Sequence, residues 1–217
     1  YMYKEKYIMN HDSSISPKES LQKLLSGNLM FQKQQTSHHT KIGNSYREKL
    51  VGGQTPYAII LTCSDSRTPP EHIFNAGLGE LFVCRNAGNL VDELILGSIE
   101  YAAVHTGCPL VCVLGHNNCG AMSAAVSVAK NLDLYESPSI DHIIRRALPA
   151  VFATMEEQAD DKAWTDAAAK KNIFNQCRNI INGSKLLRER IANKEFGVAG
   201  AWYDLGTGKV KLLYENR

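Results

Sequence analysis

The sequence predicts an α/β fold: a central, mostly parallel β-sheet with flanking helices, an antiparallel C-terminal edge strand and an N-terminal helical arm. Two observations lead to this prediction. Three short apolar runs alternate with segments of helical periodicity, an order that favours parallel strands joined by right-handed crossovers. Near the C-terminus, two further apolar runs flank a glycine-containing turn at 204–208, which is the pattern of a hairpin.

The N-terminal quarter of the chain is expected to form an arm. Residues 1–13 are polar and without pattern, which predicts a tail. Ser16, followed by Pro17 and Glu19, has the composition of a helix start, and an amphipathic leucine stripe follows it. The polar segment 32–53 is predicted to be a connection that contains one short helix.

Three predicted strands alternate with helices in the middle of the chain. The runs at 57–62, 81–84 and 110–114 are apolar and rich in β-branched residues, which indicates buried strands. Apolar spacing over 91–105 suits a helix packed on a sheet, and small residues at 121–130 predict another helix, with Cys119 in its first turn. The carboxyl ends of parallel strands meet at one sheet edge, where ligands of α/β proteins usually bind.

The last third is predicted to be helical until the final hairpin. Residues 139–194 have helical character, with interruptions at Pro149 and Gly183. Strands at 197–203 and 209–214 form the hairpin, which adds the antiparallel edge strand to the sheet.

Length and composition indicate an ordinary folded protein. The chain has 217 residues, 44% of them hydrophobic, and a formal net charge of +2. This charge balance suggests neither a nucleic-acid nor a membrane partner, and no apolar run is long enough to span a bilayer. The six cysteines do not have the spacing of a disulfide scaffold, so we expect a reducing, cytoplasmic location, or a periplasm or organelle if a targeting segment has been removed.

Two polar clusters follow predicted strands. Cys63 ends the first run and is followed by Asp65 and Arg67, whereas His116 and Cys119 follow the third run. Two thiols and one imidazole suit tetrahedral zinc, and three protein ligands leave a fourth position for water. Spacing alone does not determine whether the first cysteine joins the other two ligands. The four remaining cysteines lie in or beside apolar runs or on a predicted helix, where packing is the simpler interpretation.

Asp65 has two chemically sensible roles. As a neighbour of zinc-bound water it accepts a proton, and Arg67 keeps it ionised through a paired ion bridge. If Asp65 instead binds the metal, the site is closed to water, and a structural two-cysteine, one-histidine site completed by this carboxylate is the main rival. The segment 85–89 is either a turn in which Asn89 caps the next helix or a support for the site.

At these residues the chain resembles the β-class carbonic anhydrases, from about residue 17 to the C-terminus. The motifs that carry the resemblance are Cys63–Arg67, Phe82–Asn89, Ser98–Ala102, Gly115–Gly120 and Gly200–Asp204. The resemblance implies one domain over 1–217, in which residues 1–50 form an arm and helix that pack on a partner subunit. It also implies a homodimer or a dimer of dimers, with the site near the subunit interface.

The resemblance implies a reaction and its residues. One Zn²⁺ per chain is expected on Cys63, His116 and Cys119, with Asp65 and Arg67 as the catalytic pair. The expected activity is reversible hydration of carbon dioxide to bicarbonate and a proton, by attack of zinc-bound hydroxide. No shuttle histidine stands out for the proton that must leave.

The resemblance also implies a substrate pocket made by Gln54, Phe82, Tyr101 and Gly120, with Gln54 reaching across from the neighbouring subunit. Another subgroup of the family holds regulatory bicarbonate with a tryptophan, an arginine and a tyrosine. Ile60 stands at the tryptophan position here, which argues against that regulation. We therefore predict a site that stays open at neutral pH, with the carboxylate off the metal.

Two alternative functions remain open. Some proteins of this appearance hydrolyse carbonyl sulfide or carbon disulfide on the same scaffold, and the three ligands do not distinguish these substrates from carbon dioxide. A polar pocket group such as Gln54 favours carbon dioxide mildly. The other alternative is a non-catalytic zinc or thiol module, which predicts four protein ligands and no turnover.

Overall fold

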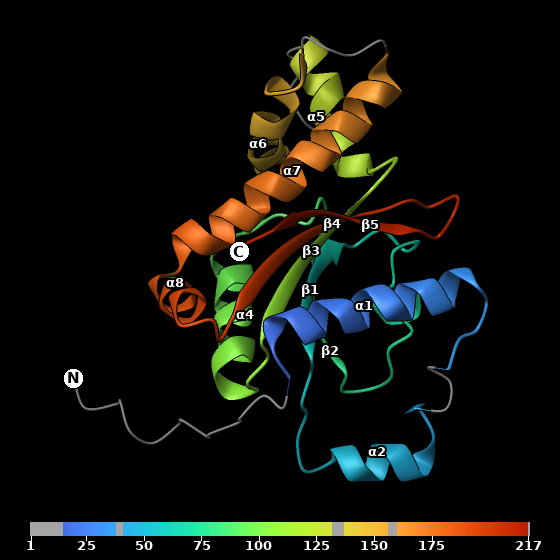
Figure 1. Cartoon of the computed structure of the whole chain (residues 1–217). Coiled ribbons are helices and arrows are strands. Elements are labelled where there is room, and N and C mark those ends of the chain that lie inside the picture. Colours follow the sequence, from blue (N-terminus) through green and yellow to red (C-terminus); the bar gives the residue numbers. More distant parts are fainter. Residues whose placement is uncertain (1–14, 38–40, 132–136, 156–159, 217) are drawn as a thin grey trace.

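A five-stranded sheet organises the structure, with the strand order β2-β1-β3-β4-β5 (Figure 1). The computed structural model describes residues 15–37, 41–131, 137–155 and 160–216. The strands are β1 (Ala58–Cys63), β2 (Leu81–Asn86), β3 (Leu110–His116), β4 (Gly197–Tyr203) and β5 (Val210–Glu215). Strands β2, β1, β3 and β4 pair in parallel, whereas β5 pairs antiparallel to β4. The predicted mostly parallel sheet with an antiparallel C-terminal edge strand is confirmed.

Helices connect and cover these strands. They are α1 (Pro17–Gln32), α2 (Asn44–Leu50), α3 (Pro70–Ile73), α4 (Glu93–His105), α5 (Gly120–Asn131), α6 (Pro138–Phe152), α7 (Asp161–Gly183) and α8 (Lys185–Ala192). Helix α1 starts as predicted, because the Ser16 hydroxyl accepts from the Glu19 amide and the Glu19 carboxylate accepts from the Ser16 amide.

Three local predictions are wrong. Pro149 lies inside α6 instead of interrupting the helical stretch, because the break comes after the end of α6. Cys119 does not lie in the first turn of α5, which begins one residue later. Asn89 does not cap α4, because the side chain of Asp92 accepts from the Ile95 amide and performs that role.

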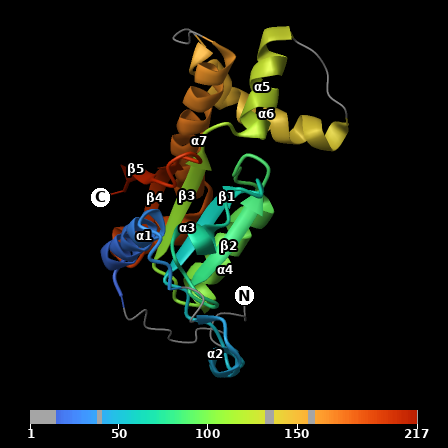
Figure 2. The ribbon, with the colours of Figure 1, turned by 90° about the vertical axis from the view of Figure 1, so that its right-hand side faces the viewer.

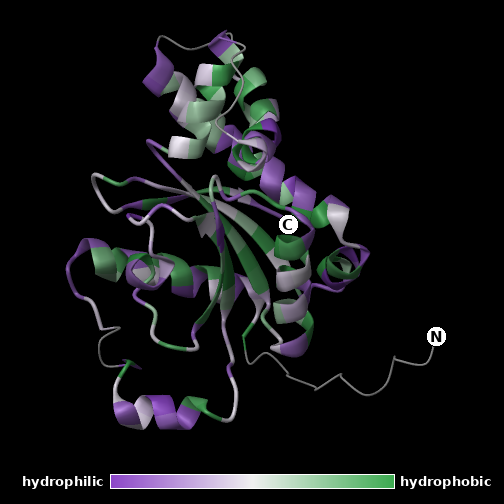
Figure 3. Ribbon diagram, turned by 180° about the vertical axis from the view of Figure 1, so that it is seen from behind, coloured by the Kyte–Doolittle hydropathy of each residue, from purple (hydrophilic) through white to green (hydrophobic). Residues whose placement is uncertain are grey.

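Apolar side chains of the sheet alternate between two helix layers. Ile59 and Leu61 face one side, where residues of α4, α7 and α8 join them in the core. Ala58 and Ile60 face the other side, which α1 and α3 cover. Successive residues of a strand point to opposite faces, so two covered faces explain why all six residues of β1 are buried. Figure 3 shows the largely hydrophobic strands between these layers.

The N-terminal region contacts its own sheet. Leu21 and Leu24 of α1 are buried against residues of β1, β3 and β4. Helix α2, by contrast, has no buried residue and projects away from the sheet (Figure 1). Packing of residues 1–50 on a partner subunit stays a prediction, and the predicted tail at 1–13 lies outside the described residues.

Helices α5 and α6 and the beginning of α7 stand together beyond the carboxyl ends of the parallel strands (Figure 2). This group therefore borders the sheet edge at which the sequence predicts the site. Among the described residues, no helix combines the length and apolar character needed to cross a membrane.

Candidate metal centre

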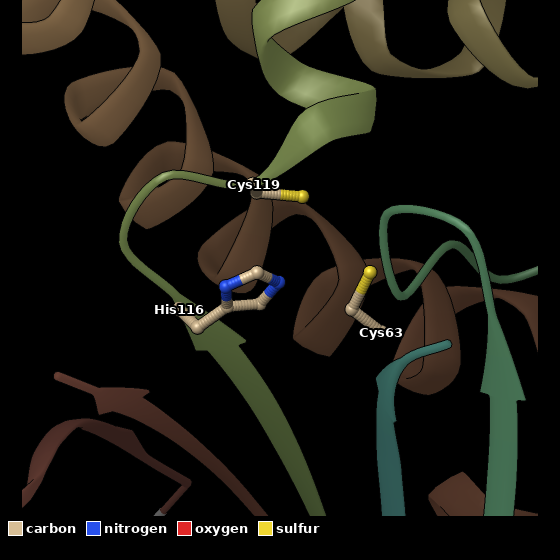
Figure 4. Close-up of side chains that lie close together, drawn as sticks. All are labelled: Cys63, His116 and Cys119. Atoms are coloured by element: carbon tan, nitrogen blue, oxygen red, sulfur yellow. The ribbon is translucent and has the colours of Figure 1, made fainter. Parts of the chain in front are cut away.

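The side chains of Cys63, His116 and Cys119 meet at the carboxyl edge of the sheet (Figure 4). Cys63 is the last residue of β1, His116 is the last residue of β3, and Cys119 immediately precedes α5. One ligand atom from each lies within 4.8 Å of the others, and all three residues are buried. The topology thus joins the first cysteine to the later pair, which spacing alone left open.

His116 has the hydrogen bonding of a metal ligand. Its Nδ1 lies 2.8 Å from the carbonyl oxygen of Asn117, a contact in which Nδ1–H donates, so that Nε2 keeps its lone pair. Nε2 is buried and has no hydrogen-bond partner among the described residues. A buried, unpartnered nitrogen beside two sulfurs fits a cation at this position, because such an atom is otherwise costly.

The pKa values of the two thiols of the centre are shifted in opposite directions, that of Cys63 downward and that of Cys119 upward. The pKa of Cys63 is lowered, first because the Cys119 thiol donates to its sulfur and also through hydrogen bonds from the amides of Gly88 and Asp65, which together outweigh the opposing effect of burial. Burial raises the pKa of the isolated Cys84 thiol to about 11. The centre is therefore built to hold negative charge on sulfur, which is the form that binds a metal.

Asp65 is held by Arg67 beside the three ligands. The guanidinium donates from Nε to Oδ1 at 2.9 Å and from Nη2 to Oδ2 at 2.6 Å, and the Arg67 amide also donates to Oδ1 at 2.9 Å. These bonds hold the pKa of the Asp65 carboxyl well below its usual range. Each carboxylate oxygen offers two acceptor sites, so Oδ1 is filled and Oδ2 keeps one.

Asp65 does not belong to the group of atoms that could share one ion. In this structure the carboxylate is paired with Arg67 instead. The predicted open site, with the carboxylate off the metal, stays a prediction.

Arg85 supports the segment that carries these groups. Its Nε donates to the carbonyl oxygen of Cys63 at 3.0 Å, and its Nη2 donates to the carbonyl oxygen of Asp65 at 2.6 Å. The segment 85–89 thus supports the site as well as leading into α4. Two buried amides of α7 contact the same loop: Asn172 donates to the carbonyl oxygen of Gly88, and Gln176 accepts from the amide of Val91. Sequence reasoning missed both. The available signal was their spacing of four residues on the apolar face of α7.

Three of the four residues expected in the substrate pocket lie away from the ligands. Gln54 is exposed and precedes the amino end of β1, whereas Cys63 ends this strand, which is roughly 17 Å long. Phe82 near the start of β2 and Tyr101 of α4 form an aromatic pair with ring centroids 6.4 Å apart. Gly120, by contrast, begins α5 directly beside the site. One chain does not bring the four residues together.

The fold and the site define a class. This is an α/β protein with a two-cysteine, one-histidine centre at the carboxyl edge of a parallel sheet, and with an ionised carboxylate held next to it. A sequence model of the carbonic anhydrase family matches residues 58–210. The chain belongs to the β-carbonic anhydrase family of enzymes.

Named relatives and solved structures agree with this assignment. Carbonic anhydrase 2 of Mycobacterium tuberculosis is 34% identical over 174 residues, which cover 80% of this chain and 82% of that protein. Carbonic anhydrase of Mycolicibacterium smegmatis is 32% identical over 199 residues, covering 91% and 93%. A tetrameric β-carbonic anhydrase from Sordaria macrospora has a TM-score of 0.73 at 27% identity, covering 92% of this chain and 100% of that one.

Proposed function

We propose that this chain catalyses the reversible hydration of carbon dioxide to bicarbonate and a proton, with one Zn²⁺ held by Cys63, His116 and Cys119. The observation that carries the proposal is the convergence of these ligand atoms within 4.8 Å, with an ionised carboxylate fixed beside them. Zinc held by three protein ligands lowers the pKa of bound water to roughly 7, which supplies a nucleophile at neutral pH.

In this proposal Asp65 is the hydrogen-bond acceptor for the reacting group, and Arg67 orients it. The free acceptor site on Oδ2 is available to a water or to the hydroxyl of bicarbonate. Because Arg67 holds the pKa of the carboxyl low, Oδ2 accepts a hydrogen bond without competing as a proton store. Arg67 also donates to the carbonyl oxygen of Asn118 at 3.3 Å, which links the carboxylate to the turn between His116 and Cys119.

The substrate pocket is completed by a second subunit in this proposal. Gln54, Phe82 and Tyr101 lie at a distance from the ligands of their own chain and on exposed or edge elements. A second copy of the chain is the simplest source of these groups for each site. The similar protein from Sordaria macrospora is described as tetrameric, which supports an assembly of this kind.

The alternatives differ in what they require of the site. A non-catalytic module needs a fourth protein ligand, and within the described residues the group that could hold an ion contains three. In such a module, the free hydrogen-bond acceptor site on Oδ2 of Asp65 would also have no function. Hydrolysis of carbonyl sulfide or carbon disulfide uses the same ligands, so substrate choice is decided by measurement.

The test is stopped-flow hydration of carbon dioxide with zinc content determined on the same sample, and carbonyl sulfide hydrolysis measured beside it. We expect rapid hydration in proportion to zinc and much slower turnover of carbonyl sulfide. A fully zinc-loaded sample without hydration activity would contradict the proposed function, and faster turnover of carbonyl sulfide would replace the substrate.

A further inference from the structure

The loop between β2 and α4 touches one of the proposed ligands. The amide N–H of Gly88 donates to Sγ of Cys63 at 3.4 Å. Gly88 has a φ of +83°, and a Cβ there would lie 3.2 Å from the Cβ of Ala121 and 3.4 Å from the Cε of Met122. Glycine therefore allows the backbone to come this close to the sulfur. The quality of the N–H···S contact depends on how rigidly the loop is held.

Two buried amides of α7 hold this loop. Asn172 donates from Nδ2 to the carbonyl oxygen of Gly88 at 2.9 Å. Gln176 donates from Nε2 to Oδ1 of Asn172 at 2.7 Å, while its Oε1 accepts from the Val91 amide at 2.9 Å. Asn172 and Gln176 are 1% and 3% exposed, so water does not compete for these bonds. These bonds lead from α7 to the carbonyl group of Gly88, the residue whose amide contacts the sulfur of Cys63.

The ends of this path are fixed as well. Arg146 of α6 donates from Nη1 to the carbonyl oxygen of Val91 at 2.9 Å, so both backbone groups of Val91 are bound. Within the loop, the Asn86 side chain accepts from the Leu90 amide at 2.8 Å and donates to the Leu90 carbonyl oxygen at 2.7 Å. Buried networks whose members are satisfied favour one arrangement of the groups that they contact.

An N–H···S bond acts on a metal ligand in two ways. It fixes the direction of the sulfur lone pairs, and it withdraws charge from the thiolate. Outer hydrogen-bond partners of metal ligands change metal affinity by roughly 10- to 100-fold when they are removed. The competing explanation is purely structural: the amides satisfy backbone groups of the loop, and their loss lowers stability without altering the centre.

We propose that Asn172 and Gln176 are positioning residues which, through Gly88, set the direction and charge of the Cys63 sulfur as a metal ligand. This inference rests on the proposed ligand set. It assigns to the middle of α7 a role in the metal centre, although α7 contributes no ligand.

The test variant is Asn172→Asp in the full chain loaded with cobalt(II) in place of zinc. The substitution keeps the size of the side chain and its acceptor for Gln176, but it removes the donor to Gly88. We expect a shifted thiolate-to-cobalt charge-transfer band and metal release to a chelator that is roughly 10- to 100-fold faster. Gln176→Glu, which keeps an acceptor for Val91, is expected to change both readouts in the same direction.

The chain offers a matched control in Asn28→Asp. Asn28 is 1% exposed, lies on α1 and donates from Nδ2 to the carbonyl oxygens of Ile73 and Gly208. This variant makes the same amide-to-carboxylate change at an equally buried position. The contacts described for Asn28 are with Ile73 and Gly208, not with Cys63 or the Gly88 loop. We expect a lower unfolding temperature but an unchanged charge-transfer band and release rate, which a structural role alone would also give for Asn172→Asp.

The outcomes separate the two proposals. If Asn172→Asp matches the Asn28→Asp control in band position and release rate, the positioning role is wrong. If the wild-type protein shows no thiolate-to-cobalt band, the ligand set of the proposed function is wrong. If both α7 variants fail to fold, the wild-type protein loaded with an NMR-active cadmium isotope provides the test. Coupling between the metal and the Gly88 amide proton supports the N–H···S contact with Cys63. Absence of this coupling overturns the contact and, with it, the positioning role.

Discussion

The guanidinium of Arg67 donates a hydrogen bond to each carboxylate oxygen of Asp65, with N–O distances of 2.9 and 2.6 Å. This bidentate pairing fixes the plane of the carboxylate and leaves one acceptor site on Oδ2. The pair lies next to the proposed ligands Cys63 and Cys119 without joining them. In the proposed mechanism this arrangement separates the task of binding the metal from the task of accepting a hydrogen bond from the reacting group.

Asp65→Asn should keep the metal and lose activity. An amide has the size of a carboxylate but does not accept and orient a hydrogen bond as the ionised carboxylate does, so we expect kcat to fall roughly 10²- to 10⁴-fold. Stopped-flow hydration and zinc content on one sample measure both effects. Near-normal rates at full zinc occupancy would remove Asp65 from the mechanism.

Cys119→Ser should remove zinc and turnover together, because a hydroxyl is a poor zinc ligand in place of a thiolate. The control is Cys108→Ser, since Cys108 is equally buried and its thiol donates to the carbonyl oxygen of Leu110, a bond that serine also makes. We expect the control to keep its zinc. Full metal occupancy in Cys119→Ser would show that the ligand assignment is wrong.

Mixing two inactive variants should restore activity if the pocket spans two subunits. In a mixed dimer of Cys119→Ser and Gln54→Ala chains, one site combines intact ligands from the second chain with Gln54 from the first. We expect the mixture, after dissociation and reassembly, to be more active than either variant alone. The hydration rate measures this, and no gain above the sum of the two variants would place the pocket within one chain.

Stability should depend on pH through Asp65. Its folded-state pKa lies below the unfolded value of about 3.9, so its contribution is complete above that value and is lost as pH falls through the folded pKa. The difference in unfolding temperature between wild type and Asp65→Asn should be constant from about pH 5 to 8 and shrink below about pH 4. Because the side chain of Arg67 is 54% exposed and water screens the pair, the effect is modest.

A chelator-treated series at the same pH values separates this effect from acid release of the metal. If the difference between the two proteins instead grows as pH falls below about 4, the carboxyl pKa is not lowered by folding.

Gly27→Ala should destabilise the packing of α1. A Cβ at this position would lie 1.9 Å from the carbonyl oxygen of Phe74, a backbone atom that does not move aside as a side chain does. We expect the free energy of unfolding in urea to fall by about 1–3 kcal/mol. Gly52→Ala, where a Cβ meets nothing within 4 Å, is the control and should be near-neutral. Equal stability of the two variants would mean that α1 does not lie this close.

The sequence predicted the sheet and the ligands better than the surroundings of the site. Strand ends at Cys63 and His116 follow from local apolar runs, and their meeting follows from parallel topology, so short patterns were sufficient. The role of Arg85 could not be predicted, because it depends on which carbonyl groups lie within hydrogen-bond distance of its guanidinium. The register between β1 and β2 decides which groups these are. Asn172 and Gln176 lie at buried positions of α7, but their partners are decided only by where the loop at 86–91 is placed.

All three proposed ligands lie within residues 58–120, whereas the amides that hold the Gly88 loop come from α7 at 161–183. During synthesis on a ribosome, the sulfurs and the imidazole emerge before the helix that fixes their hydrogen-bond donor. A nascent chain synthesised only as far as α5 therefore contains all three proposed metal ligands but lacks the helix that holds the Gly88 loop. A metal ion bound at that stage would be held without the α7 amides, unlike an ion bound after the complete chain has left the ribosome.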